Sequence, residues 1–186
     1  RDLHSFPTRR SSDLVQPQTP IKVYIAKVDN PSRGSKPHVL ASRSHPEFIR
    51  RLFEMEVPEI YSGTVEIKSV SREAGERTKL AVFSEDKNVD PVGACVGNKG
   101  DRVNRIVDEL NGEKIDIITW DADPVKFITN ALAPAKVEEI IIDEEEKIAN
   151  VKVKEDQLSL AIGKKGQNVR LAARLTGWKI DIKAAE

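Results

Sequence analysis

Residues 156–182 read DQLSLAIGKKGQNVRLAARLTGWKIDI, and residues 90–117 read DPVGACVGNKGDRVNRIVDELNGEKIDI. The two stretches are copies of one pattern, which is the signature of a repeated structural unit. Both end in Lys-Ile-Asp-Ile after a one-residue deletion in the second copy. A glycine pair falls at the same place in both: Gly97 and Gly100 match Gly163 and Gly166.

Each copy reads as helix, glycine turn, helix and strand. Asp90 predicts a helix cap, with Pro91 at the first helical position, and Asp156 predicts the cap of the second copy. Gly112 is expected to end the longer helix of the first copy in a left-handed conformation. That helix carries one apolar stripe at positions i, i+3, i+4 and i+7: Val103, Ile106, Val107 and Leu110.

A helix and two strands are expected before each copy. Ahead of the first copy, a capping box of Ser44 and Glu47 predicts the start of a helix. Alternating apolar residues predict the strands. In order, the expected elements are a helix over 44–55, strands over 64–70 and 78–83, a helix over 123–132, and strands over 137–142 and 148–154. Both copies therefore read helix-strand-strand-helix-helix-strand, which is an α+β fold.

The glycine turns carry the chemistry. Glycine permits positive φ and lets a bulky ligand backbone approach closely. Each turn leads into a helix N-terminus, whose free N–H groups favour a phosphate. Such a turn clamps a nucleic-acid backbone, while the bases lie along the neighbouring helix and strand. The turn residues are Gly97, Asn98, Lys99 and Gly100, and Gly163, Lys164, Lys165 and Gly166.

Charge is segregated although it sums to zero, with 30 basic and 30 acidic residues. Residues 157–180 hold no acid, which predicts a basic groove in the second copy. The first copy is more balanced because Asp101 follows its turn, so stronger phosphate contacts are expected from the second. We add Arg102, Arg170 and Arg174 to the candidate RNA-binding residues; an ordinary solvated face is the alternative for such arginines.

Other features have structural interpretations. Trp120 and Trp178 are expected to pack rather than to stack on bases, and Cys95 is expected to be a small core residue. One cysteine excludes a disulfide or a cysteine-based metal site within the chain. We find no catalytic triad, phosphate-binding Walker loop or metal-ligand spacing, so neither an enzyme nor a cofactor is expected. No apolar stretch has the ~20 residues needed to span a bilayer.

The beginning of the chain differs from the rest. Residues 1–14, which include Arg9 and Arg10, resemble a translated sequencing adapter, and we treat residues 1–20 as a non-native or disordered leader. From Ile21 apolar residues alternate with polar ones, which predicts a half-buried strand. Residues 38–44 are expected to form a second strand after a turn-rich loop. A lone hairpin is marginal in water, so upstream strands are expected to complete this sheet.

The repeated order with GxxG between its middle helices resembles the prokaryotic, type II, KH domain. The two-copy arrangement resembles the NusA family of bacterial transcription factors, through PVGACVG, ELNGEKIDII, NALAPAKV and the whole of residues 156–182. This resemblance implies the end of an S1 domain, an OB-type barrel, over 21–44. It implies KH domains over 45–121 and 122–186.

The resemblance implies a protein that binds nascent single-stranded RNA and contacts RNA polymerase and other transcription factors. Without a membrane span or a secretory signal in the sequence, a cytoplasmic protein is expected, and we expect it to be a monomer. It would modulate pausing, termination and antitermination. Asp101 and the pair Asn98-Lys99 depart from the usual family pattern, so the first clamp is the less certain one. The alternative is a protein-interaction scaffold on the polymerase whose KH folds bind RNA weakly or not at all.

Overall fold

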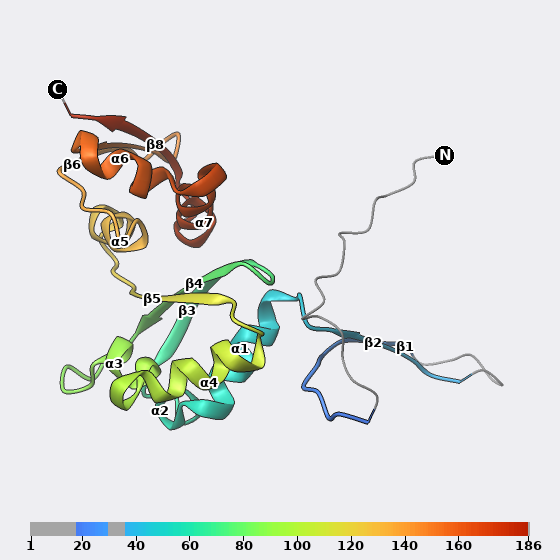
Figure 1. Ribbon diagram of the computed structural model, residues 1–186. Helices are drawn as coiled ribbons and strands as arrows, with labels where there is room; N and C mark the ends of the chain where they lie inside the picture. Colours follow the sequence, from blue (N-terminus) through green and yellow to red (C-terminus); the bar gives the residue numbers. More distant parts are fainter. Residues whose placement is uncertain (1–17, 30–35, 186) are drawn as a thin grey trace, which may run out of the picture.

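The computed structural model describes residues 18–29 and 36–185. Most of the expected leader, residues 1–17, and most of the loop in the first hairpin, residues 30–35, lie outside the described residues. Three sheets are present in the described part, one of two strands and two of three strands. The two three-stranded sheets belong to two units with the same order of elements (Figure 1).

The first unit begins with a helix that is followed by one extra turn of helix. A hairpin, two further helices and a last strand follow. Strand β4 is central, antiparallel to β3 and parallel to β5. The elements are α1 Pro46–Glu56, α2 Pro58–Tyr61, β3 Glu66–Glu73, β4 Arg77–Phe83, α3 Pro91–Val96, α4 Asp101–Glu109 and β5 Lys114–Thr119.

The second unit repeats this order without the extra turn of helix. Strand β7 is central, antiparallel to β6 and parallel to β8. The elements are α5 Pro124–Ala131, β6 Glu139–Asp143, β7 Ile148–Val153, α6 Glu155–Ile162, α7 Gln167–Thr176 and β8 Lys179–Ala184. The predicted α+β fold with two copies of helix-strand-strand-helix-helix-strand is confirmed.

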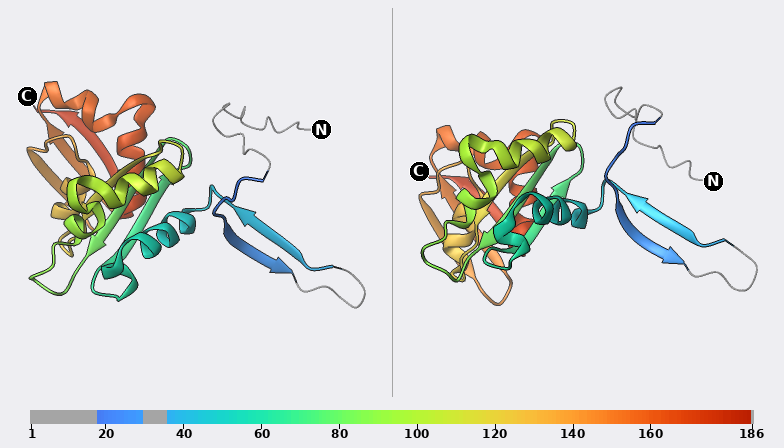
Figure 2. Two further views of the ribbon diagram at one scale, coloured as in Figure 1. Left: turned by 60° about the horizontal axis from the view of Figure 1, so that its bottom comes forward. Right: turned by 90° about the horizontal axis from the view of Figure 1, so that it is seen from below.

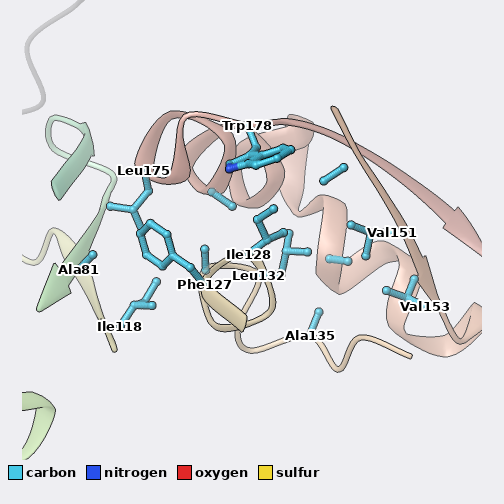
Figure 3. Close-up of a cluster of buried hydrophobic side chains, with 14 residues drawn as sticks. Ala81, Ile118, Phe127, Ile128, Leu132, Ala135, Val151, Val153, Leu175 and Trp178 are labelled. Carbon is cyan, nitrogen blue, oxygen red and sulfur yellow. The ribbon is translucent and has the colours of Figure 1, made fainter. Parts of the chain in front are cut away.

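Both faces of the first unit's sheet are covered, which explains the continuous burial along β4. Leu80 and Val82 point into the core made with α1, α3 and α4. Ala81, on the opposite face, belongs to a different core together with Phe127 and Leu175 of the second unit. Figure 3 shows Ala81 and Ile118 beside these two side chains. The second unit therefore closes the sheet of the first, and the two share a hydrophobic core.

The expected packing residues lie where the sequence predicts. Trp178 is buried and Trp120 is partly buried, and both pack in the shared core. Cys95 is fully buried in the core of the first unit, where burial raises the pKa of its thiol to about 12. The apolar stripe of α4 also faces inward, with Ile106 and Leu110 buried.

Two predicted helix starts are wrong. Helix α1 is capped by His45, whose Nδ1 accepts from the Glu47 amide at 3.1 Å, rather than by Ser44. Pro46 occupies the first helical position, which makes the preceding residue the cap. Helix α6 begins at Glu155 after Lys154, which makes no side-chain cap, so Asp156 lies inside the first turn. An acid there still favours the helix through its dipole.

The other predicted helix ends agree better with the structure. Asp90 caps α3 through a bond from the Val92 amide at 3.1 Å, and Pro91 is the first helical residue. After α4 the left-handed conformation is shared by Asn111, at φ 56°, and Gly112, at φ 89°. The predicted end of this helix is therefore correct within about two residues, the usual uncertainty of helix boundaries.

The first hairpin, β1 Tyr24–Asp29 with β2 His38–Ser42, projects from the two units (Figures 1 and 2). The expected half-buried strand is wrong in its burial, because Ile25 is 49% exposed and only Tyr24 of β1 is partly buried. Tyr24 stacks on His45 with ring centroids 4.8 Å apart. Two strands alone have no second layer against which to bury an apolar face.

Candidate nucleic-acid interface

The first glycine turn joins α3 to α4 through one turn of 3-10 helix, Asn98–Gly100. Gly97 has φ 76° and ψ 179°, a combination that is open to glycine alone. Lys99 and Gly100 are both left-handed, at φ 52° and 81°. Asn98 and Lys99 are exposed to solvent. The turn thus opens directly onto the N-terminus of a nine-residue helix.

The second turn, between α6 and α7, repeats this geometry closely. Gly163 has φ 77° and ψ 169°, Lys165 has φ 54° and Gly166 has φ 72°. Its 3-10 turn spans Lys164–Gly166 and leads into the ten-residue helix α7. The amide of Gly166 donates to the Gly163 carbonyl at 3.0 Å. The repeat in the sequence is therefore also a repeat in backbone conformation.

Crowding as well as conformation requires glycine at the first position of each turn. A Cβ on Gly163 would lie 2.8 Å from the backbone nitrogen of Asn168. A Cβ on Gly97 would lie 2.1 Å from Asp101 Oδ1 and 2.7 Å from Arg102 Cγ, both in flexible side chains. The second turn is thus the more tightly constrained of the two.

Three lysines present their charge on these turns. Lys99, Lys164 and Lys165 are exposed, and none of them forms an ion pair with any described residue. These lysines lie in the turns that directly precede the N-termini of α4 and α7, where amide N–H groups favour an anion. The second turn has two such lysines and the first turn has one, which gives the second the stronger attraction for a phosphate.

Carboxylates of the first unit restrain its own basic residues. Arg102 Nη1 lies 2.8 Å from Glu59 Oε2 and also donates to the Ala94 carbonyl at 2.7 Å. Arg105 pairs with Glu56 at 3.3 Å. Asp101 stands in the first turn of α4, beside the glycine turn. The local field at the first turn is therefore less positive than at the second.

The arginines of the second unit meet a carboxylate from the first. Glu73, at the end of β3, accepts from Arg170 Nε at 2.6 Å and from Arg170 Nη2 at 3.1 Å. Arg174 Nη1 lies 3.7 Å from the same carboxylate, and Gln167 donates to it at 2.9 Å. The bond from Arg170 lowers the pKa of Glu73, although partial burial opposes this.

The sequence predicts the residues of each turn but not Glu73. That residue stands 97 positions before Arg170, in a charged hairpin with no distinguishing motif. Asn168 is also absent from the candidate set, yet it is buried and its amide bonds the carbonyls of Ala161 and Leu132. Asn168 follows the turn at the repeat position of Arg102, and an alignment of the two copies is the signal that could have identified it.

No group of three or more histidine, cysteine, aspartate or glutamate residues in the described ranges could hold a metal ion. Within the same residues, no helix is long and apolar enough to cross a membrane. The candidate interface consists of two glycine turns, one in each unit, of which the first includes Asn98. Arg102, Arg170 and Arg174 lie on the helices that follow these turns.

Family models match both units. One described as the NusA-like first KH domain matches residues 43–120, and one described as the NusA-like second KH domain matches residues 124–186. The crystal structure of APE1850 superposes with a TM-score of 0.54 over 74% of this chain and 97% of its own. At 24% identity, this likeness shows the fold alone.

Bacterial relatives extend the match along the chain. The Transcription termination/antitermination protein NusA of Bacillus subtilis (strain 168) is 61% identical over 173 residues, which are 93% of this chain and 46% of that protein. The protein of the same name from Thermus thermophilus is 53% identical over 175 residues, or 94% and 45% of the two chains. The chain spans about half the length of the curated relatives it matches.

Proposed function

This chain belongs to the NusA family of transcription factors, and on that premise we propose that it is a single-stranded RNA-binding module. The observation that carries the proposal is the pair of GxxG turns, each with left-handed backbone and unpaired lysines at a helix N-terminus. A KH turn of this kind clamps the nucleic-acid backbone. Phosphates would lie against Lys99 in the first unit and against Lys164 and Lys165 in the second.

In the whole protein, the RNA would be the nascent transcript, and the activity would be control of pausing, termination and antitermination. RNA polymerase and other transcription factors are the partners that this activity requires. Such a protein acts in the bacterial cytoplasm, where transcription takes place, and the module would work as a monomer. The relatives carry the name of a transcription termination/antitermination protein, which is a factor and not an enzyme.

The proposed domains are an S1 remnant over 21–44, a first KH domain over 45–121 and a second KH domain over 122–186. The proposed RNA-binding residues are those named in the sequence analysis, except that Arg170, whose three guanidinium nitrogens are bonded to Glu73 and to the Lys165 carbonyl, would act through the turn. The second turn would contribute more than the first. Asn98 and Arg102 would act from the first unit. Arg174, whose side chain is 56% exposed, would add to the phosphate contacts of the second.

The test is a binding titration of the chain with short single-stranded RNA and with DNA of the same sequence. We expect Lys164→Asp with Lys165→Asp to weaken RNA binding by at least about tenfold, because two phosphate contacts become repulsive. The control is Lys87→Asp with Lys126→Asp, which reverses two exposed lysines outside the turns. Equal affinity of the turn variant and the native chain would contradict the assignment.

A second candidate function is a scaffold that contacts polymerase without RNA. Asp101 beside the first turn and the Arg102–Glu59 pair favour it for the first unit. Under that function, capture of RNA polymerase would survive both RNase treatment and charge reversal of the second turn. Capture that fails after either treatment would favour RNA binding instead.

A further inference from the structure

The contact between Glu73 and Arg170 connects the interface between the two domains to the second glycine turn. Arg170 uses Nε and Nη2 to hold both carboxylate oxygens of Glu73, and its Nη1 donates to the backbone carbonyl of Lys165 at 3.0 Å. One guanidinium therefore joins the β3–β4 hairpin of the first domain to the glycine turn of the second.

The carbonyl that accepts this bond belongs to Lys165, whose backbone conformation is strained. Lys165 has φ 54° and ψ 29°, a left-handed conformation that is unfavourable for a residue with a Cβ. A hydrogen bond to its carbonyl fixes the peptide plane that follows this residue. The amide of that plane is the one of Gly166, which lies in the wall of the clamp. Arg170 thus supports the strained part of the turn.

The first turn lacks an equivalent support. Lys99 has nearly the same conformation, with φ 52° and ψ 26°. The repeat position of Arg170 is Asn104 there, and no side chain among the described residues donates to the Lys99 carbonyl. The two turns therefore share a backbone shape, but among the described residues only the second has a carbonyl joined to the neighbouring domain through an arginine.

We propose that Arg170 is a positioning residue that holds the second RNA clamp in its binding geometry, and that Glu73 of the first domain holds Arg170 in place. The inference rests on the proposed function of the glycine turns. RNA affinity at the second turn would then depend on correct docking of the two domains. Arg170 itself would touch the protein rather than the RNA.

The same geometry has an opposite interpretation, in which Glu73 competes with an RNA phosphate for Arg170 and Arg174. The two interpretations predict opposite changes in RNA affinity when Glu73 is replaced. Removal of a competing carboxylate would tighten RNA binding and steepen its dependence on salt. Removal of a support would weaken binding and leave the number of phosphate contacts unchanged. The hydrogen bonds of Arg170 favour the interpretation in which Glu73 supports the turn, because two of the guanidinium nitrogens are bonded to Glu73 and the third is bonded to the turn.

The test measures RNA affinity of the full chain over a series of salt concentrations for Glu73→Gln and Arg170→Lys. Arg170→Lys keeps the charge but replaces the planar fork, whose three nitrogens bond both carboxylate oxygens and the carbonyl, with a single ammonium nitrogen. We expect each variant to bind RNA about fivefold more weakly. The slope of log affinity against log salt should stay unchanged, whereas each lost phosphate contact would reduce its magnitude by about 0.7. Glu85→Gln, at an exposed glutamate that follows the opposite end of β4, is the control and should bind like the native chain.

The charge swap Glu73→Arg with Arg170→Glu separates the turn from the domain contact. It restores an ion pair across the interface, but a carboxylate at position 170 has no N–H to give to the Lys165 carbonyl. Because Arg174 and Gln167 also contact Glu73, the inference predicts that the swap recovers only part of the thermal stability lost in Arg170→Glu, without recovery of RNA affinity. Full recovery of affinity would show that docking alone matters and would overturn the role of the carbonyl bond.

Amide hydrogen exchange without RNA tests the support independently of the proposed function. In Glu73→Gln, exchange of the Gly166 amide should accelerate by at least about fivefold, while the Gly100 amide exchanges at its native rate. Unchanged exchange at Gly166, tighter RNA binding by Glu73→Gln, or a reduced salt slope in Arg170→Lys would each overturn the inference. If alanine at both Lys164 and Lys165 left RNA binding unchanged, the proposed function would fail, and the exchange result would still decide the support.

Discussion

Lys79, in the central strand of the first domain, donates a hydrogen bond of 2.9 Å to the backbone carbonyl of Ala133 in the second domain. Its ammonium also lies 3.1 Å from Asp116, and the side chain is fully buried. Burial lowers the pKa of Lys79, and the charge of Asp116 opposes that shift. A buried cation with fixed partners in both domains ties their relative position to hydrogen-bond geometry as well as to apolar packing.

Lys79→Ala is expected to lower the free energy of unfolding by about 3 kcal/mol, because it leaves a cavity and an unpaired carbonyl at Ala133. Lys79→Met should lower it by only about 1 kcal/mol, since methionine fills the volume and Asp116 keeps Arg77 as a partner. Urea denaturation of both variants measures the difference. A loss below about 1 kcal/mol for Lys79→Ala would contradict the structural role assigned to this lysine.

The ion pair between Glu73 and Arg170, called here the Glu73 bridge, predicts that the stability of the fold depends on pH. Because the pKa of Glu73 is lowered in the folded chain from its ordinary value of 4.5, its stabilising contribution is fully present above that value. The contribution is lost as the pH falls below 4.5 and passes through the lowered pKa. Unfolding curves of the native chain and of Glu73→Gln should therefore converge on acidification from pH 6 to about pH 3. A difference between them that is constant over this range would contradict the bridge.

The stability lost when a glycine is replaced by alanine should depend on the atoms around the added Cβ as well as on the backbone conformation. Gly163→Ala is expected to destabilise the chain by about 3 kcal/mol or more, since its Cβ would meet backbone of Asn168. Gly97→Ala is the matched control, because Gly97 has the same backbone conformation, φ 76° and ψ 179°, and its added Cβ would meet side chains rather than backbone. It should cost about 1 to 2 kcal/mol from that conformation. Equal losses in thermal unfolding would show that contact with Asn168 is unimportant.

The projecting hairpin should contribute little to the stability of the KH pair. A chain that begins at residue 43 keeps the Arg43–Glu109 pair and loses the stack of Tyr24 on His45. Its free energy of unfolding should fall by no more than about 1 kcal/mol. It should also associate less, because Val28, Val39 and Leu40 of the hairpin are more than half exposed. Light scattering and urea denaturation of the two chains test both statements; a loss of several kcal/mol would contradict them.

The sequence alone predicted most of the fold, for a physical reason. Helix stripes, caps such as Asp90 and the glycine turns are local patterns, and the repeat made each of them visible twice. The missed caps at Ser44 and Asp156 were local errors about a neighbouring residue, His45 in one case and Lys154 in the other. The predicted burial of β1 was wrong. An alternating pattern indicates that one face of a strand is meant to pack against a second layer, but it does not show that such a layer is present.

The candidate site was predicted in part for the same reason. Lys164 and Lys165 follow directly from the spacing of the turn that carries them. The bond from Arg170 to Glu73 is set by the docking of two domains, and no short-range pattern encodes it. The acid-free stretch 157–180 likewise predicted a basic surface, whereas a carboxylate from the other domain reaches Arg170 and Arg174.

The most direct test of the central claim is the salt dependence of RNA affinity for the native chain and for Lys164→Ala with Lys165→Ala. If these lysines contact phosphates, the native chain binds more weakly as salt rises, and the variant's slope is smaller by about 1.4, which is two contacts at about 0.7 each. The same substitution at Lys99 should reduce the slope by no more than about 0.7. Equal slopes for the native chain and the double variant would mean that the second glycine turn does not clamp RNA.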